Sequence, residues 1–177
     1  MEENSQTEEV TTRSAGIRYG LVLGVVSILF FLLLMMFDVN IAGPARWISW
    51  VIYVVMIFLA HKYYKDNGSG FMAYGQGIGI AFWMALIGSL ISSIFSYVYM
   101  KFVDAGFIDK MKEMQVEQFQ ERGMSDEQID QAMKFSEMFM NPEVMLVMGI
   151  VGGIVSLVIV ALLVTIFTQK KSPEPFA

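Results

Sequence analysis

The chain has 177 residues, of which 55% are apolar, and its mean hydropathy is +0.55. This composition is more apolar than that of a soluble domain of the same length, so it predicts a small membrane protein. The net charge is −5, no basic patch suggests nucleic acid, and the absence of cysteine excludes disulfides, thiolate catalysis and cysteine metal sites.

The N-terminal residues are polar and acidic, and we expect a disordered tail over residues 1–16. A signal peptide is disfavoured because its n-region would be basic and its apolar run would end at a small-residue cleavage site. The 19 residues from Tyr19 to Phe37 carry no charge, and as a helix they extend about 28 Å, enough to cross a bilayer core. They predict the first of three transmembrane helices within residues 17–100.

The second predicted span follows a turn over residues 38–46. Its charge-free part, residues 47–60, has only 14 residues, and residues 61–64 extend it by reaching to the interface. Trp50 and its neighbour Trp47 supply an aromatic belt at one end. His61 is the only histidine, and no second histidine or nearby carboxylate is in register with it, so we expect an interfacial anchor rather than a ligand or a proton carrier.

The third predicted span covers residues 74–100, after a flexible turn over residues 65–70. Its start, Gly75-Gln76-Gly77-Ile78-Gly79, superficially suggests a phosphate loop. However, no strand precedes it and the rest of the nucleotide fingerprint is missing. We therefore interpret these glycines as positions of close helix packing.

The fourth predicted span lies within residues 142–169, and its apolar core runs from Val144 to Thr168. Asn141 is suited to the N-cap, Pro142 to the first turn, and Glu143 to the positive end of the helix dipole. A short C-terminal tail, residues 170–177, follows the span.

Residues 101–141 form the only long charged segment, with five basic and nine acidic residues. They predict a water-facing helical hairpin, with one amphipathic helix over about 104–122 and another over about 126–140. Gly123 is suited to the left-handed residue that ends the first helix. Ser125 and Gln128 match a capping box that begins the second.

The two amphipathic helices have apolar faces that can pack on each other, on the membrane surface or on a protein partner. The acidic outer faces disfavour a flat position on anionic lipid. The residues that we assign to this hairpin or partner face are Phe107, Ile108, Met111, Met114, Phe119, Ile129, Met133 and Phe139.

Small residues recur at helical spacing in the first, third and fourth spans. Such residues let helix backbones approach closely, and packing between spans of one chain is favoured over a dimer seam. The predicted helix-packing positions are Gly16, Gly20, Gly24, Gly77, Ala81, Ala85, Gly88, Ser92, Gly149, Gly152, Gly153 and Ser156.

Several functions are disfavoured by the residues that the spans lack. No Asp, Glu, Lys, Arg or His occurs between Asp66 and Lys101 or between Glu143 and Lys170, whereas pumps and ion-coupled transporters usually carry such groups. Nine of the 15 methionines lie between Met100 and Met148, and thioethers bind Cu(I). Methionine is also a flexible apolar filler, and no histidine or cysteine supports a copper site. We therefore predict no catalytic residue, cofactor or metal site.

Three short segments carry a family resemblance. They are Phe71-Met72-Ala73-Tyr74-Gly75 at the entry to the third span, Tyr97-x-Tyr99 at its exit, and Gly123-Met124-Ser125-Asp126-Glu127-Gln128-Ile129 before Pro142. With the glycine-bearing first span, their order resembles a domain-of-unknown-function family of small four-span membrane proteins from Bacteroidota. The resemblance implies a bacterial inner-membrane protein and brings no activity or cofactor.

The sequence thus predicts an all-α membrane protein, with four transmembrane helices in an antiparallel bundle and a two-helix amphipathic excursion between spans three and four. The function expected first is a non-enzymatic subunit or scaffold whose hairpin contacts a protein partner or a second copy. The alternative is a transporter of lipid or another small molecule. A polar cavity lined by Gln76, Ser89, Ser92, Ser93 and Ser96 would favour the transporter, and a dry glycine-packed interface would oppose it.

The density of Lys and Arg near short loops predicts the orientation in the membrane. The raw count of basic residues does not decide, since six lie on the side of the termini and six on the other side, Arg46 and the five in the excursion. However, the first six lie close to span ends, whereas the five in the excursion are spread over residues 101–141 and outnumbered by acids. We therefore expect the termini in the cytoplasm and residues 101–141 in the periplasm.

Overall fold

The computed structural model describes residues 10–37 and 46–172. Within these ranges four helices are long and apolar enough to span a membrane, namely α1 (Thr12–Met36), α2 (Arg46–Asp66), α3 (Tyr74–Val98) and α6 (Pro142–Thr168). A π-helical turn, η1 (Tyr99–Val103), extends α3, and two shorter helices follow, α4 (Phe107–Glu121) and α5 (Asp126–Glu137). The predicted all-α, four-span architecture is confirmed.

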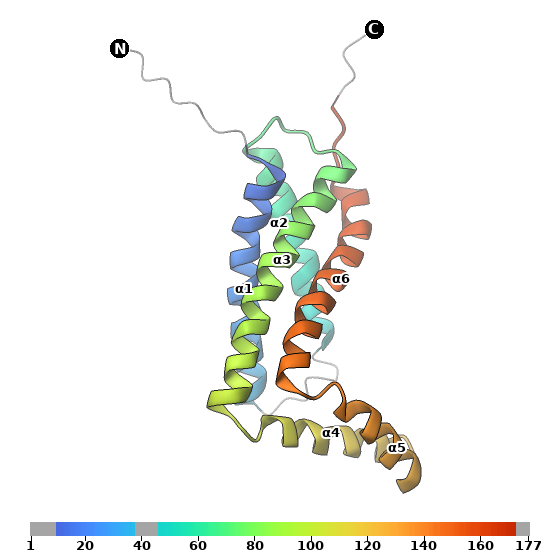
Figure 1. The fold of residues 1–177 in the computed structure, drawn as a ribbon. Coiled ribbons are helices and arrows are strands. Elements are labelled where there is room, and N and C mark those ends of the chain that lie inside the picture. The colour runs from blue at the N-terminus through green and yellow to red at the C-terminus, as the bar shows by residue number, and fades with distance from the viewer. Residues whose placement is uncertain (1–9, 38–45, 173–177) are drawn as a thin grey trace, which may run out of the picture.

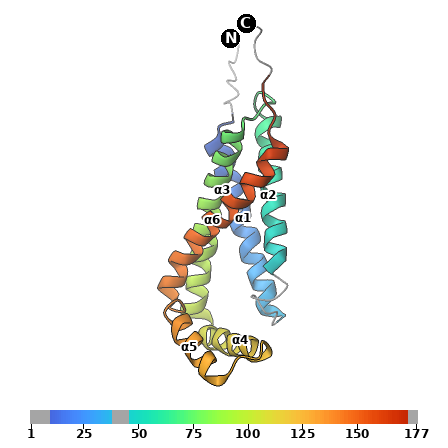
Figure 2. The same ribbon diagram turned by 90° about the vertical axis from the view of Figure 1, so that its right-hand side faces the viewer.

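The four long helices run side by side, and the described chain begins and ends at the same end of the bundle (Figure 1). α3 lies between α1 and α6 and packs against both. α4 and α5 lie across the opposite end, with α4 oriented crosswise to the bundle axis (Figures 1 and 2). The hairpin therefore lies crosswise at the end of the bundle and extends sideways beyond the start of α6 (Figure 1).

The first helix begins earlier than the sequence suggested. Thr11 is its N-cap, and a reciprocal capping box joins the Thr11 and Ser14 side chains to each other's backbone N–H groups. Ala15 and Gly16 are already buried. The prediction of a disordered tail over residues 1–16 is therefore wrong for 12–16, and residues 1–9 lie outside the described part of the chain, as does most of the predicted 38–46 turn.

The residues that were predicted to end and begin the helices of the hairpin are confirmed in those roles. Gly123 has φ +74°, a left-handed conformation that glycine adopts without a steric penalty. Ser125 caps α5 through a capping box with Gln128, and Asn141 caps α6 by accepting a hydrogen bond from the Glu143 N–H at 2.9 Å. Both helices of the hairpin are shorter than predicted, because α4 begins at Phe107 and α5 ends at Glu137.

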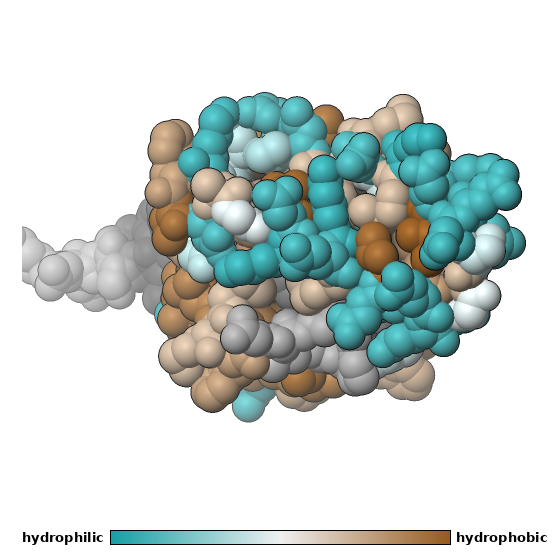
Figure 3. Space-filling model, turned by 90° about the horizontal axis from the view of Figure 1, so that it is seen from below, coloured by the Kyte–Doolittle hydropathy of each residue, from teal (hydrophilic) through white to brown (hydrophobic). Residues whose placement is uncertain are grey.

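Viewed from the hairpin end, the molecule is mostly hydrophilic, with hydrophobic residues visible between the polar ones (Figure 3). At this end Lys101 joins the end of α3 to the start of α6, because its Nζ lies 2.7 Å from Glu143 Oε1. It also donates to the Tyr97 hydroxyl at 2.8 Å. These contacts hold α3 and α6 together where the hairpin begins.

Candidate intramembrane cavity

A seam of glycines packs α1 tightly against α3. A Cβ atom added to Gly16 would lie 2.7 Å from the carbonyl oxygen of Ile80, and one added to Gly20 would lie 2.9 Å from that of Met84. Such distances leave no room for a side chain, so these glycines allow the two backbones to approach. The part of the bundle nearer the termini is therefore closed and dry.

A buried polar contact closes the same end between α2, α3 and α6. His61 is 0% exposed; its Nε2 lies 3.0 Å from the Gly77 carbonyl oxygen, and its Nδ1 lies 2.7 Å from the Thr168 hydroxyl. Because a carbonyl oxygen only accepts, Nε2 carries the proton, and in a neutral ring Nδ1 accepts from Thr168. His61 thus differs from the predicted interfacial anchor: it lies inside the bundle and joins three helices.

The bundle opens toward the hairpin. The ribbons of α2 and α6 meet near the termini and diverge toward the opposite end (Figure 2). Here three adjoining cavities of about 440, 230 and 60 Å³ all share Tyr53 of α2 and Ser92 of α3 as lining residues. The largest is within the range of about 300–1,000 Å³ that is typical of small-molecule sites.

The cavity walls combine hydroxyl groups with apolar surface. Ser27 and Ser49 line the 230 Å³ cavity, and Ser93 and Ser96 line the 440 Å³ cavity. Within the described residues the Tyr53 hydroxyl has no hydrogen-bond partner. A serine in a helix can bond to its own preceding turn, but a tyrosine hydroxyl cannot reach so far back. At bilayer depth an unpaired hydroxyl costs about 1–3 kcal/mol, so this group is suited to a ligand or a water molecule.

The first helix of the hairpin closes one side of the largest cavity. Phe107 is only 4% exposed and, together with Met111, lines that cavity from α4. The Phe107 ring also packs against Phe31 of α1 and Tyr99 of η1, with centroid distances of 5.9 and 6.2 Å. The buried face of α4 thus covers the cavity at the end of the bundle.

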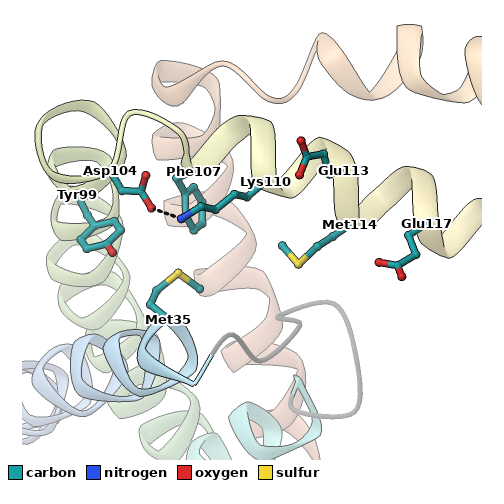
Figure 4. Close-up of a pocket in the computed structure, with 8 residues that line it drawn as sticks. All are labelled: Met35, Tyr99, Asp104, Phe107, Lys110, Glu113, Met114 and Glu117. Atoms are coloured by element: carbon teal, nitrogen blue, oxygen red, sulfur yellow. Dashed lines mark hydrogen bonds and ion pairs between the residues drawn. The ribbon is translucent and has the colours of Figure 1, made fainter.

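A separate pocket of about 390 Å³ lies on the other side of Phe107. Met35 of α1 and Met114 of α4 face its interior, and Lys110 reaches back to Asp104, with an Nζ to Oδ2 distance of 3.1 Å (Figure 4). Glu113 and Glu117 also line this pocket. Phe107 thus lines both the cavity within the bundle, whose described lining residues are uncharged, and a charged pocket at the end of the bundle.

The comparison with known protein families identifies the family of this chain but gives no activity. The sequence profile of the family described as "Protein of unknown function (DUF4199)" matches residues 18–170. The chain belongs to this family. No curated protein and no solved structure matches it. The predicted resemblance to a domain-of-unknown-function family is therefore confirmed, whereas the Bacteroidota origin stays a prediction.

Most of the predicted small residues of this DUF4199 protein lie at helix contacts. Gly24 faces Ile91, Gly77 faces Thr165, and Gly88 faces Leu23, while Ala81 and Ala85 are buried in the core. Gly149 and Gly153 of α6 face Ser93 and Ser89 of α3. These contacts continue the close packing of α3 on both of its sides.

Two of the predicted packing residues have a different environment. A Cβ atom added to Gly152 would meet no atom within 4 Å, so Gly152 faces outward. The interpretation as a packing glycine is wrong here, because a rotation of 100° separates it from Gly153. Ser92 is half-buried and lines all three cavities. Ser156 is also half-buried.

The predicted hairpin face is divided among several surroundings. Phe107 and Met111 line the cavity, Met114 lines the outer pocket, and Ile129 is 7% exposed. Residues Ile108, Phe119 and Met133 are half-buried. Phe139, at 42% exposed, is the member of this set that remains open.

Sequence reasoning found part of the cavity and missed the rest. It named Ser89, Ser92, Ser93 and Ser96, which line the cavities, but also Gln76, which is exposed and accepts a hydrogen bond from the Ala73 N–H. It missed the lining residues on α1 and α2, among them Ser27, Phe31, Ser49 and Tyr53. The sequence signal that could have identified Ser27, Ser49 and Tyr53 is a hydroxyl residue within an otherwise apolar span. In the described residues no group of three or more His, Cys, Asp or Glu could hold a metal ion.

Proposed function

We propose that this protein binds an uncharged amphiphile, a lipid or a lipid-like small molecule, inside its membrane bundle. The observation that supports this function is the set of three adjoining cavities that share Tyr53 and Ser92. This role corresponds to the lipid or small-molecule transporter that the sequence offered as the alternative, and it requires binding but not yet a direction of transport.

The chemistry of the walls favours an uncharged ligand. Among the described residues that line the three cavities there is no Asp, Glu, Lys, Arg or His. A charged group placed there would lose its hydration without gaining a counter-ion, which is costly at bilayer depth. Serine and tyrosine hydroxyls can instead donate to and accept from hydroxyl, ester or carbonyl groups. Phe31, Leu146 and Met145 supply surface for an apolar chain.

The shape of the bundle favours a ligand that comes from the bilayer. α2 and α6 diverge on the hairpin side, and Gly149, which lines two of the cavities, is exposed. α4 covers the cavity toward the end of the bundle through Phe107 and Met111. A molecule in the cavity would therefore be covered from water and accessible between two helices from lipid.

The test is photolabelling of the full-length protein in vesicles with a fatty alcohol that carries a diazirine group in its chain. We expect labelled peptides from the α2 segment around Tyr53 and the α3 segment around Ser92. Ser92→Leu fills the cavity and should lower this labelling several-fold. Gly152→Leu adds similar bulk on the open face of α6 and serves as the matched control. Equal labelling of the two variants at these peptides would refute the proposal.

We also propose the orientation expected from the sequence, in the bacterial inner membrane with the termini in the cytoplasm. Support comes from the distribution of charge: the end of the bundle that holds the termini carries Arg13, Arg18, Lys62, Lys65, Lys170 and Lys171. Among the described residues at that end, Asp66 is the one acidic side chain. The basic residues of the hairpin are spread over residues 101–141, so the density of Lys and Arg near short loops is higher at the end that holds the termini, which favours the cytoplasm for that end.

A second candidate function is the subunit or scaffold role that the sequence placed first. The observation that favours it is the exposure of Phe135, Met138 and Phe139 at the end of α5. Most of the predicted partner face is not free, however, because Phe107 and Ile129 are buried. The labelling experiment described below separates contact with a second copy from contact with lipid at Phe135 and Met138.

A further inference from the structure

We propose that Phe135, Met138 and Phe139, here called the α5 edge, insert into the boundary between headgroups and acyl chains of the membrane that the bundle spans. This inference is independent of the cavity. No contact within the described chain covers this apolar surface, and we assign lipid as the surrounding that covers it.

The three side chains are exposed although their helix is amphipathic. Phe135 is 64% exposed, Met138 67% and Phe139 42%, and the two aromatic rings pack on each other with centroids 5.2 Å apart. The hairpin already has its own inward side, where Ile129 is 7% exposed. The α5 edge is therefore a second apolar surface, separate from the one that holds the hairpin together.

Two charged residues of α5, Asp130 and Glu137, lie on a different side of the helix from Phe135. At 100° per residue, Phe135 is roughly 140° from Asp130 and 160° from Glu137. Asp130 pairs with Lys134 at 2.7 Å, and Glu137 pairs with Lys112 of α4 at 3.0 Å. The helix can thus keep its charged side in water while its apolar edge enters lipid, as interfacial helices do.

The position of the edge favours lipid. The chain passes from α5 directly into α6, and Phe139 lies two residues before Asn141, the N-cap of that span. At the same end of the bundle Phe37, Trp47 and Phe102 are 66%, 63% and 75% exposed. Exposed aromatic residues at span ends mark the membrane interface. The α5 edge continues this belt beyond the four spans.

The size of the surface also favours lipid over a protein partner. A stable protein interface takes roughly 20–30 residues from each side, whereas the α5 edge has three. Insertion into lipid has no such minimum, because each buried aromatic side chain contributes separately. The acidic side of the hairpin repels anionic headgroups, so the proposal applies to neutral and zwitterionic lipid.

The test uses single-cysteine variants, since the natural chain has no cysteine. Full-length Phe135→Cys and Met138→Cys proteins are labelled with the fluorophore NBD and reconstituted in phosphatidylcholine vesicles. Asp130→Cys, on the charged side of α5, is the control. Quenching is compared between iodide in the water and phosphatidylcholine that carries a doxyl group near the top of its acyl chain.

We expect the doxyl lipid to quench the labels at Phe135 and Met138 several-fold more strongly than the label at Asp130, and iodide to show the reverse order. Iodide quenching at Phe135 and Met138 equal to that at Asp130 would overturn the proposal, because the edge would lie in water. Protection from both quenchers would overturn it as well and would favour contact with a second copy of this chain. Neither result affects the fatty-alcohol test of the cavity.

Discussion

The Nδ1 atom of His61 in α2 lies 2.7 Å from the Oγ1 atom of Thr168, in the last turn of α6, although 107 positions separate the two residues in the chain. Lys65, one turn after His61, donates to the Thr168 carbonyl oxygen at 2.8 Å. Lys65 of α2 therefore satisfies the Thr168 carbonyl, one of the last carbonyl groups of α6, which have no partner within the helix. These two bonds join α2 to α6 at the end where the bundle is closed.

Removal of the Thr168 hydroxyl should destabilise the bundle. Thr168→Val keeps the shape of the side chain but leaves the buried Nδ1 of His61 without a donor, at a cost of about 1–3 kcal/mol. The matched control is Thr165→Val, since the Thr165 hydroxyl is buried and has no hydrogen-bond partner among the described residues. That replacement should be neutral or stabilising. Thermal unfolding in mild detergent measures both, and an equal loss in the two variants would contradict the role of the His61–Thr168 bond.

The same substitution should destabilise the bundle at Gly153 and have no effect at the adjacent Gly152. A Cβ atom at Gly153 would lie 2.8 Å from the Cβ of Ser89, whereas one at Gly152 would meet no atom within 4 Å. Gly153→Leu should therefore separate α6 from α3 and cost about 1–3 kcal/mol or more. Gly152→Leu should leave the bundle intact. The temperature of aggregation in detergent is the measurement, and similar values for the two variants would exclude close packing at Gly153.

Loss of the α5 cap should loosen the hairpin without affecting the spans. Ser125→Ala removes the oxygen that accepts from the Gln128 N–H, worth about 1 kcal/mol. Amide hydrogen exchange in the first turn of α5 should then become about fivefold faster, while α6 is unchanged. Ser125→Asp supplies another good N-cap and should restore slow exchange. Unchanged exchange in Ser125→Ala would mean that tertiary contacts, not the cap, hold this turn.

The proposed orientation can be tested with one cysteine on each side of the membrane. Gln120 lies in the hairpin and Ser69 in the connection after α2, and both are exposed. In bacterial cells with a permeabilised outer membrane, a membrane-impermeant maleimide should label Gln120→Cys and not Ser69→Cys. The opposite pattern would place the hairpin in the cytoplasm. Labelling after cell lysis controls for the reactivity of both positions.

The elements of the fold and their ends were predictable because their causes are local. A run of apolar residues long enough for the bilayer defines each span, and the neighbouring backbone decides each cap. Ser125 and Gln128 begin α5 as predicted, and Asn141 and Pro142 begin α6. The early start of α1 had a local cause too, in the Thr11 and Ser14 side chains, but the acidic composition of the N-terminal residues obscured it.

Only the tertiary structure decided which face of each helix meets which neighbour. Gly152 and Gly153 are identical in the sequence, yet one faces outward and the other faces Ser89, because a rotation of 100° separates them. The sequence could not decide this because small residues on α6 provide room for a close approach without specifying the direction from which α3 comes.

The candidate site depends on convergence of segments that are distant in the chain. Tyr53 and Ser92 share a cavity because α2 and α6 diverge on the hairpin side while α3 stays packed between α1 and α6. His61 is buried for the converse reason, since the same two helices meet near the termini. The sequence by itself determined that this chain has four spans and a charged hairpin. The relative tilt of the spans decided where the bundle is closed and where it can hold a ligand, because that tilt brings α2 and α6 together at one end and separates them at the other.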